Sequence, residues 1–262
     1  MPPSKRTSAP KAPRLTRFSP TRLSLYRTCP KAYAFQYDQG LRWGGQSSAQ
    51  SFGGSLHRTL QAFHDQGGAA SVSIDALKAT LAERWSSAGY GTVEEAAEFR
   101  AVGEELLTRY HTAAQEPGRE TVATEVTVSR RYEDFVLFGK IDRLDRRPDG
   151  SLEVVDYKSG RHAFTEGEVR ESLAMTVYQV LVAREHPGVA VYTGILNLRT
   201  GDSVFVLRTP EELDSAEAEI AALARTILAD SIKAPTPGSQ CARCPYPSVC
   251  PEGRAWLRDR EG

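Results

Sequence analysis

Hydrophobic residues recur at helical spacing between residues 19 and 114. Ser19-Pro20-Thr21 indicates a helix start, an N-cap serine followed by proline in the first turn, and Cys29-Pro30 interrupts the helix that follows. The Gly-, Ser- and Gln-rich stretch 40–54 is expected to be a loop. Further helices are predicted over 55–64, 74–88 and 93–114.

After residue 120 the pattern changes to the two-residue period of strands. The segments 121–129, 135–144 and 151–158 are predicted to form an antiparallel meander, because the turn sequence Arg147-Pro148-Asp149-Gly150 joins the last two. The remaining elements are a helix over 166–184, strands over 189–198 and 203–207, and an amphipathic helix over 210–229. This order fits a single α/β domain with a mixed central sheet flanked by helices.

Composition divides the chain into a tail and one domain. Residues 1–16 are rich in Pro, Ser and Lys, and we expect a disordered basic tail there. The domain is predicted over 17–262, with a helical part over 55–117, a sheet core over 120–208, and a C-terminal helix and cysteine-rich segment over 210–262. With 40% hydrophobic residues among 262, the chain is long enough to bury a sizeable core.

Charge bears on the choice of partner. The 33 Lys and Arg residues balance 33 Asp and Glu residues, and a net charge of zero by itself argues against a nucleic-acid partner. The charge is uneven, however: residues 1–50 hold nine basic residues and one acid, a net charge of +8, and the remainder carries −8. This asymmetry predicts a basic surface that meets phosphates beside an acidic region that holds cations.

The sequence lacks the signals of a membrane protein or of a motor. No stretch approaches the roughly 18 apolar residues of a membrane-spanning helix, and the basic N-terminus is not followed by the apolar segment of a secretory signal. We therefore expect a cytoplasmic protein without a membrane partner. No Gly-x4-Gly-Lys-Ser/Thr phosphate loop occurs, so ATP-driven unwinding would need a helicase partner in trans.

Acidic residues end two neighbouring predicted strands. The period of a strand places Asp156 and Lys158 on one face, at the end of an apolar ridge, and Asp142 ends the preceding strand. A hairpin would bring Asp142 and Asp156 side by side, where the two carboxylates repel each other unless a cation lies between them. Hard oxygen ligands with at most one imidazole suit Mg²⁺ or Mn²⁺.

Three more residues complete this candidate site. His57 on the preceding helix can supply the imidazole, and Glu125 on the first strand is a candidate fourth ligand. Lys158 can orient or help deprotonate a water and stabilise charge on a phosphate, which fits hydrolysis of a phosphodiester. Each residue also has an ordinary explanation, as a turn Asp, an exposed Lys or a structural His, but their joint order along the chain is far more specific.

Four cysteines form a second candidate site. Cys241, Cys244 and Cys250 lie within ten positions in a Pro-rich segment, and Cys29 would complete a four-thiolate site that ties the first helix to the C-terminus. Four thiolates serve Zn²⁺ or an iron–sulfur cluster equally well, so the spacing leaves both open. Four unlinked thiols are the alternative without a metal.

Together these residues resemble the PD-(D/E)XK nucleases, specifically the RecB-like group that includes AddB-type nuclease domains and the CRISPR adaptation nucleases with an iron–sulfur cluster. The resemblance runs from about Phe18 to Cys250. The matching segments are Ser19-Pro20-Thr21-Arg22-Leu23 with Tyr26, Cys29-Pro30 and Tyr33, Gly54-Ser55-Leu56-His57, Gly139-Lys140-Ile141-Asp142-Arg143, Asp156-Tyr157-Lys158, and Cys241-x2-Cys244-Pro245 to Cys250-Pro251.

The resemblance implies a restriction-endonuclease-like fold and a role for each site residue. The metal ligands would be His57, Asp142, Asp156 and the Tyr157 carbonyl, with Glu125 as a further acid and Lys158 as the catalytic lysine. Tyr178 matches the family's tyrosine on the following helix, but Ala174 stands where the family has a glutamine, and the adjacent Gln179 points about 100° further round that helix.

The resemblance also decides between the two cofactors at the cysteines. It implies a 4Fe–4S cluster on Cys29, Cys241, Cys244 and Cys250, with Zn²⁺ as the alternative. We expect this cluster to act as a structural clasp.

The leading prediction is a metal-dependent DNA nuclease, an exonuclease on single strands or ends, which the resemblance connects with DNA repair or recombination. Basic side chains near the first helix would contact phosphates: Arg17, Arg22, Arg27 and Lys31. One alternative is a non-catalytic DNA-binding or scaffold module of the same fold, which Ala174 favours. A zinc-clasped RNA-processing nuclease is another.

Overall fold

The computed structural model describes residues 15–42, 45–114 and 118–260, and it is built around a six-stranded sheet. The strands are β1 (Thr16–Phe18), β2 (Glu120–Arg131), β3 (Phe135–Arg146), β4 (Leu152–Lys158), β5 (Val191–Asn197) and β6 (Ser203–Leu207). Most of the predicted tail, residues 1–14, lies outside the described residues. β1 begins at Thr16, the last residue assigned to that tail.

β3 holds the sheet together because both of its edges are paired. β2 runs antiparallel along nearly the whole of one edge. On the other edge β1 pairs in parallel with residues 135–137, and β4 pairs antiparallel with residues 143–146. β5 then lies parallel to β4, and β6 lies antiparallel to β5. The predicted three-stranded meander and mixed sheet are confirmed.

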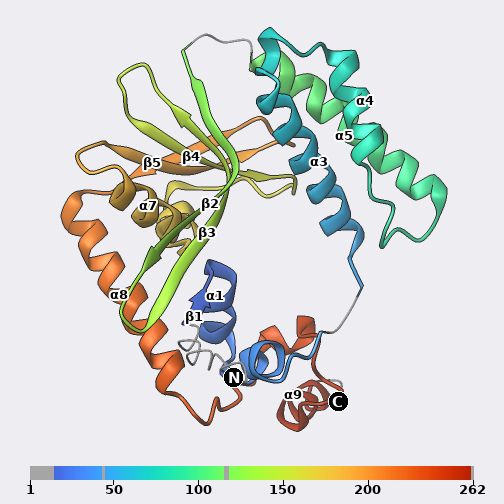
Figure 1. The fold of residues 1–262 in the computed structure, drawn as a ribbon. Coiled ribbons are helices and arrows are strands. Elements are labelled where there is room, and N and C mark those ends of the chain that lie inside the picture. The colour runs from blue at the N-terminus through green and yellow to red at the C-terminus, as the bar shows by residue number, and fades with distance from the viewer. Residues whose placement is uncertain (1–14, 43–44, 115–117, 261–262) are drawn as a thin grey trace, which may run out of the picture.

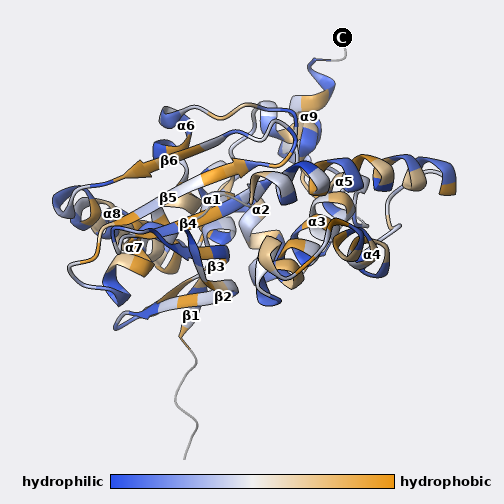
Figure 2. Cartoon of the chain, turned by 90° about the horizontal axis from the view of Figure 1, so that it is seen from above, coloured by the Kyte–Doolittle hydropathy of each residue, from blue (hydrophilic) through white to orange (hydrophobic). Residues whose placement is uncertain are grey.

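Helices cover the sheet from two sides. α3 (Ser48–Asp65), α4 (Ile74–Arg84) and α5 (Val93–Ala113) lie on one side, and α7 (Leu173–Glu185) and α8 (Pro210–Ala229) on the other (Figures 1 and 2). The shorter helices are α1 (Pro20–Thr28), α2 (Pro30–Tyr33), η1 (Ala34–Asp38), η2 (Gly68–Ala70), α6 (Glu166–Glu171), η3 (Ser239–Arg243) and α9 (Pro251–Arg258). Within the described ranges, none of the helices has the length and hydrophobicity needed to cross a bilayer.

Two hydrophobic cores follow from these two layers. One joins β3 and β4 to α7 and α8 and includes Ile141, Val154 and Val180. The other joins β4 to α3, α4 and α5 and includes Val155 and Leu56. Because Val154 and Val155 are neighbours on one strand, their side chains project to opposite faces, and β4 is covered by hydrophobic side chains on both.

The predicted loop over 40–54 is wrong for its last part, because residues 48–54 form the start of α3. Ser47 and Gln50 explain the early start. The Ser47 hydroxyl accepts a hydrogen bond from the Gln50 N–H, and the Gln50 side chain accepts one from the Ser47 N–H. This reciprocal pairing satisfies two backbone donors at the helix end, and it favours helix even though glycines follow.

Three other short-range features also differ from the prediction. The helix expected over 166–184 is two helices, because Ser172 ends α6 and caps α7 by accepting the Met175 N–H. β1 is only three residues long, too short for a two-residue period to be recognised, and it forms by pairing with β3. α9 was not predicted at all; Cys250 caps it through the Gly253 N–H.

α7 approaches β3 at a glycine. A Cβ atom at Gly139 would lie 2.6 Å from Cδ1 of Tyr178 and 3.6 Å from Cδ1 of Leu181. Real carbon atoms do not approach to 2.6 Å, so the Tyr178 ring occupies its position only because residue 139 has no side chain.

Replacement of Gly139 with alanine is expected to lower the free energy of unfolding by about 1–3 kcal/mol, because the Tyr178 ring must leave a closely packed position. Gly160→Ala is the matched control, since a Cβ there meets no atom within 4 Å. Urea unfolding of the two variants measures the difference. Equal stability of both would contradict this account of the contact.

Candidate functional site

Three acids lie in one row across three neighbouring strands. Register pairs on either side bracket Glu125 of β2 and Asp142 of β3, which puts these two residues opposite each other. The last β3–β4 pair, Arg143 with Val155, puts Asp142 level with Asp156 of β4. Asp142 and Asp156 therefore lie side by side, as expected, and Glu125 lies next to Asp142. We call these three residues the acid row.

His57 adds an imidazole to the acid row from α3. Ligand atoms of His57, Glu125 and Asp142 all lie within 4.8 Å of one another, and the three residues are partly buried. His57 Nδ1 lies 3.3 Å from Asp142 Oδ1, and its Nε2 lies 3.1 Å from the carbonyl oxygen of Tyr157. Burial lowers the pKa of His57, but the Asp142 hydrogen bond and the charges of the acid row outweigh it and raise the pKa.

Glu125 has a strained backbone. Its φ of 47° lies in the left-handed region, which is uncommon for a residue with a side chain. The alternation of β2 shifts here, because Ala123 and Val126, three positions apart, both pack against the same core. Strain of this kind persists where surrounding structure enforces it, and it is concentrated at functional sites.

Asp156 is the acid most closely paired with a lysine. It is buried, with 9% of its surface exposed, and its Oδ2 forms an ion pair with Lys158 Nζ at 2.5 Å. Burial and the charge of Asp142 raise the pKa of Asp156, although Lys158 and His57 oppose the shift. Lys158 is one positive charge beside three neighbouring acids, so the acid row fits a bound cation as well.

A second lysine at the acid row was missed from the sequence. Lys140 forms an ion pair with Glu125, and its side chain is 62% exposed. The signal was available, because Lys140 precedes Asp142 by two residues and so shares its face of the strand. The acid row is thus flanked by an ammonium group at each end, Lys140 at Glu125 and Lys158 at Asp156.

The four basic residues expected to contact phosphates differ in their surroundings. Arg17 and Arg27 are exposed. Arg22 is partly buried, and its Nε donates to the Tyr33 hydroxyl at 2.8 Å. Lys31 is also partly buried, on α2. Because its guanidinium is bonded to Tyr33, Arg22 stabilises the N-terminal segment. Arg17 and Arg27 are the more accessible of the four basic residues.

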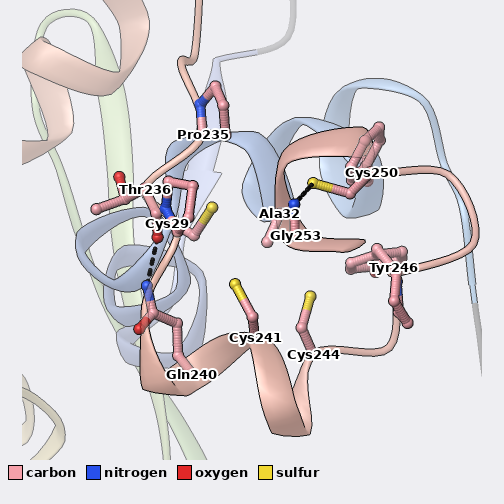
Figure 3. Close-up of a pocket in the computed structure, with 13 residues that line it drawn as sticks. Cys29, Ala32, Pro235, Thr236, Gln240, Cys241, Cys244, Tyr246, Cys250 and Gly253 are labelled. Carbon is pink, nitrogen blue, oxygen red and sulfur yellow. Dashed lines mark hydrogen bonds between the residues drawn. The ribbon is translucent and has the colours of Figure 1, made fainter. Parts of the chain in front are cut away.

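The four cysteines gather around one pocket. Cys29 comes from the junction of α1 and α2, Cys241 from η3, Cys244 directly after it, and Cys250 from the start of α9. Figure 3 shows their side chains around a common space, and all four are free thiols. The sequence-distant Cys29 therefore does meet the C-terminal three.

A glycine keeps the space between the thiols open. A Cβ atom at Gly253 would lie 3.3 Å from Cys250 Sγ and 3.8 Å from Cys241 Sγ. Burial raises the pKa of Cys244 and of Cys250, and the charges of neighbouring thiolates add to both shifts. Four thiolates in this pocket would therefore need a positively charged cofactor, and the residues present fit one.

Contacts between protein groups also join the two ends of the chain here. The rings of Phe35 and Tyr246 lie 5.4 Å apart between centroids, and the Tyr246 hydroxyl donates to the Leu41 carbonyl at 3.2 Å. The Tyr26 hydroxyl donates to Asp230 Oδ2 at 2.6 Å. The N- and C-terminal segments are thus held by packing and hydrogen bonds as well as through the cysteine pocket.

Comparison with known proteins identifies the family. A family model described as the PD-(D/E)XK nuclease superfamily matches residues 17–251. The chain belongs to this superfamily. No match is found among the curated proteins.

Two solved structures resemble this superfamily member. The crystal structure of SSO0001 has 13% identity and a TM-score of 0.45, with 92% of this chain and 88% of that chain covered. A protein from Eubacterium rectale named "Putative exonuclease" has 14% identity and a TM-score of 0.48, with 80% and 79% covered.

One position departs from the pattern that the resemblance led us to expect. The Tyr178 ring packs against Gly139 of β3, and burial and the charges of the acid row raise its pKa. Gln179 does not replace the glutamine missing at Ala174, because it is fully buried on another side of α7. Its Nε2 donates to the Val191 carbonyl at 2.6 Å, and its Oε1 accepts from Arg208.

Two substitutions of Glu125 separate backbone strain from chemistry. Glu125→Gly and Glu125→Ala both remove the carboxylate, but only glycine adopts a φ of 47° without steric cost. The glycine variant is therefore expected to be about 1 kcal/mol more stable than the alanine variant. Urea unfolding measures this difference, and an alanine variant as stable as the glycine variant would show that residue 125 is unstrained.

Proposed function

We propose that this chain is a metal-dependent deoxyribonuclease that hydrolyses phosphodiester bonds in single-stranded DNA or at DNA ends. The observation that carries the proposal is the acid row, with His57 beside it and Lys158 at one end. Membership of the PD-(D/E)XK nuclease superfamily supports the same class of reaction.

Mg²⁺ or Mn²⁺ would be held by His57, Glu125 and Asp142, with Asp156 and the Tyr157 carbonyl beside them. Carboxylate oxygens with one imidazole form a ligand set that suits these ions. The bound ion would polarise a phosphate oxygen and neutralise charge that develops there. The acid row supports this assignment, because its carboxylates otherwise repel each other.

Lys158 and Tyr178 would act on the water and the phosphate. Lys158 is held near Asp156 but remains 45% exposed, so its ammonium group can donate hydrogen bonds to an entering water and to a phosphate oxygen. A tyrosine hydroxyl is protonated at neutral pH, and the raised pKa of Tyr178 favours that form further, so the hydroxyl can donate a hydrogen bond.

DNA would approach the basic N-terminal segment. Arg17 and Arg27 are exposed there, and Arg17 lies above the ring of Phe138, 4.7 Å from its centroid, on β3. The net charge of +8 over residues 1–50 supports a polyanionic substrate. An exonuclease role in repair or recombination, a helicase partner in trans and a cytoplasmic location stay proposals based on the sequence.

A non-catalytic DNA-binding module is the second candidate. The position of Ala174 favours it, because no amide stands there and Gln179 is turned away. Such a module would bind DNA without metal, would lose affinity steeply with salt, and would not cleave. An RNA-processing nuclease with Zn²⁺ at the cysteines would instead prefer RNA.

The direct test is digestion of end-labelled DNA with Mn²⁺. Wild-type protein is expected to degrade linear single-stranded DNA, while Asp156→Asn and Lys158→Met lose at least about a hundredfold in rate. Asp202→Asn and Lys78→Met are matched controls, because each makes the same chemical change away from the acid row. Circular DNA and RNA of the same sequence are included as competing substrates.

The outcomes distinguish the candidates. Full activity of the Asp156 or Lys158 variant would overturn the assignment of the acid row. Metal-independent binding without cleavage would favour the non-catalytic module. Cleavage of circular DNA would exclude a strict exonuclease, and preference for RNA would favour the third candidate.

We also propose that the cysteine pocket holds a 4Fe–4S cluster that joins the two ends of the chain. The four cysteines line one pocket, and four thiolates can hold either Zn²⁺ or such a cluster. The resemblance of the sequence to the iron–sulfur branch of the family favours the cluster.

Cys29→Ser is expected to abolish the visible absorbance of the cluster and to lower the melting temperature, since the clasp between the chain ends is lost. Thr28→Ser is the matched control on the neighbouring residue. Iron, sulfide and zinc analysis of both proteins accompanies the melting curves. Loss of absorbance without loss of stability would contradict the structural role of the cluster. One zinc ion per chain without iron would show that the pocket binds zinc instead.

A further inference from the structure

A buried polar cluster lies under the acid row, on the other face of the sheet. Its centre is Arg143, which follows Asp142 on β3 and is only 6% exposed. Arg143 Nη1 donates to the Tyr157 hydroxyl at 2.8 Å and also contacts the Tyr110 hydroxyl. Arg143 Nη2 pairs with Asp145 Oδ2 at 2.9 Å. We call these residues, together with His64, the Arg143 cluster.

His64 connects the Arg143 cluster to α3. Its Nε2 lies 2.9 Å from Arg143 Nη1, and its Nδ1 lies 3.0 Å from the Thr121 hydroxyl. Because Nε2 faces a guanidinium donor, the proton of neutral His64 belongs on Nδ1. Burial and the charge of Arg143 lower the pKa of His64 to about 3, so the imidazole stays neutral and can accept from Arg143.

Tyr157 connects the Arg143 cluster to the candidate metal site. Its hydroxyl lies in the cluster, 3.0 Å from the Tyr110 hydroxyl. Its backbone contacts the candidate metal site. The Tyr157 N–H donates to Asp142 Oδ2 at 2.8 Å, and the Tyr157 carbonyl contacts His57 Nε2. The neighbours of Tyr157 in sequence are Asp156 and Lys158. One buried side chain thus anchors the strand segment on which four site residues depend.

α3 is fixed by the same cluster. His57 and His64 are seven residues apart, about two helical turns, and therefore lie on the same side of α3. His64 contacts Arg143 of β3, and His57 contacts Asp142, the preceding residue of the same strand. Tyr110 adds a contact from α5, so two helices of one layer are oriented relative to β3 and β4.

We infer that Arg143, Tyr157 and Tyr110 are positioning residues that set the geometry of the metal site through the Tyr157 backbone and through α3. This inference rests on the proposed function. The side chains of these three residues contact neither substrate nor metal. Mutation of outer groups of this kind typically lowers metal affinity by about tenfold to a hundredfold. A cluster that only satisfies buried polar groups would affect stability alone.

The test removes one hydroxyl at a time. Tyr157→Phe and Tyr110→Phe keep the backbone and the ring but break contacts to Arg143. Tyr132→Phe is the matched control, because its partly buried hydroxyl donates to Glu217 at 2.6 Å, away from the Arg143 cluster. Mn²⁺ affinity is measured on the folded protein by electron paramagnetic resonance, together with thermal stability and, separately, the kcat and KM for DNA cleavage.

Both cluster variants are expected to bind Mn²⁺ about tenfold more weakly than wild type and to lose kcat with little change in KM. The control should match them in loss of stability and keep wild-type Mn²⁺ affinity. Variants with wild-type Mn²⁺ affinity would overturn the inference.

The wild-type protein distinguishes this failure from failure of the proposed function. A wild type that binds Mn²⁺ but cleaves nothing would overturn the nuclease alone, and a loss of affinity in the two variants would still support the positioning role. A wild type that binds no Mn²⁺ would overturn both.

Discussion

The mutual repulsion of the three carboxylates in the acid row is the physical constraint on which the arrangement of the site depends. The register of β2, β3 and β4 sets Glu125, Asp142 and Asp156 side by side, and such a row is unfavourable unless positive charge lies near it. Lys140 and Lys158 supply ammonium groups at its two ends, and the pKa of His57 is raised beside it. A bound cation would therefore stabilise the acid row by reducing this repulsion.

Hydrophobic packing provides the rigidity that this arrangement needs. β4 is covered on both faces, by α7 and α8 through Val154 and by α3 to α5 through Val155. The strand that carries Asp156 and Lys158 therefore cannot shift without disturbing two cores. Polar groups were placed inside these cores at a cost, which the hydrogen bonds of the Arg143 cluster offset.

Segments near the two ends of the chain also lie side by side in this domain. Cys29 and the three C-terminal cysteines surround one pocket, and Tyr246 packs against Phe35 beside it. The described segment with the exposed Arg17 and Arg27 is thereby held against the C-terminal cysteine segment.

Local patterns in the sequence determined the strands other than β1 and most helices, and they singled out His57, Asp142, Asp156 and Lys158 as candidates, because period and motif spacing depend only on near neighbours. They did not determine contacts between distant segments. β1 forms only by pairing with β3, and the left-handed backbone of Glu125 lies where β2 runs opposite Asp142. Register and packing, which the tertiary structure alone decides, turned separate acids into one row.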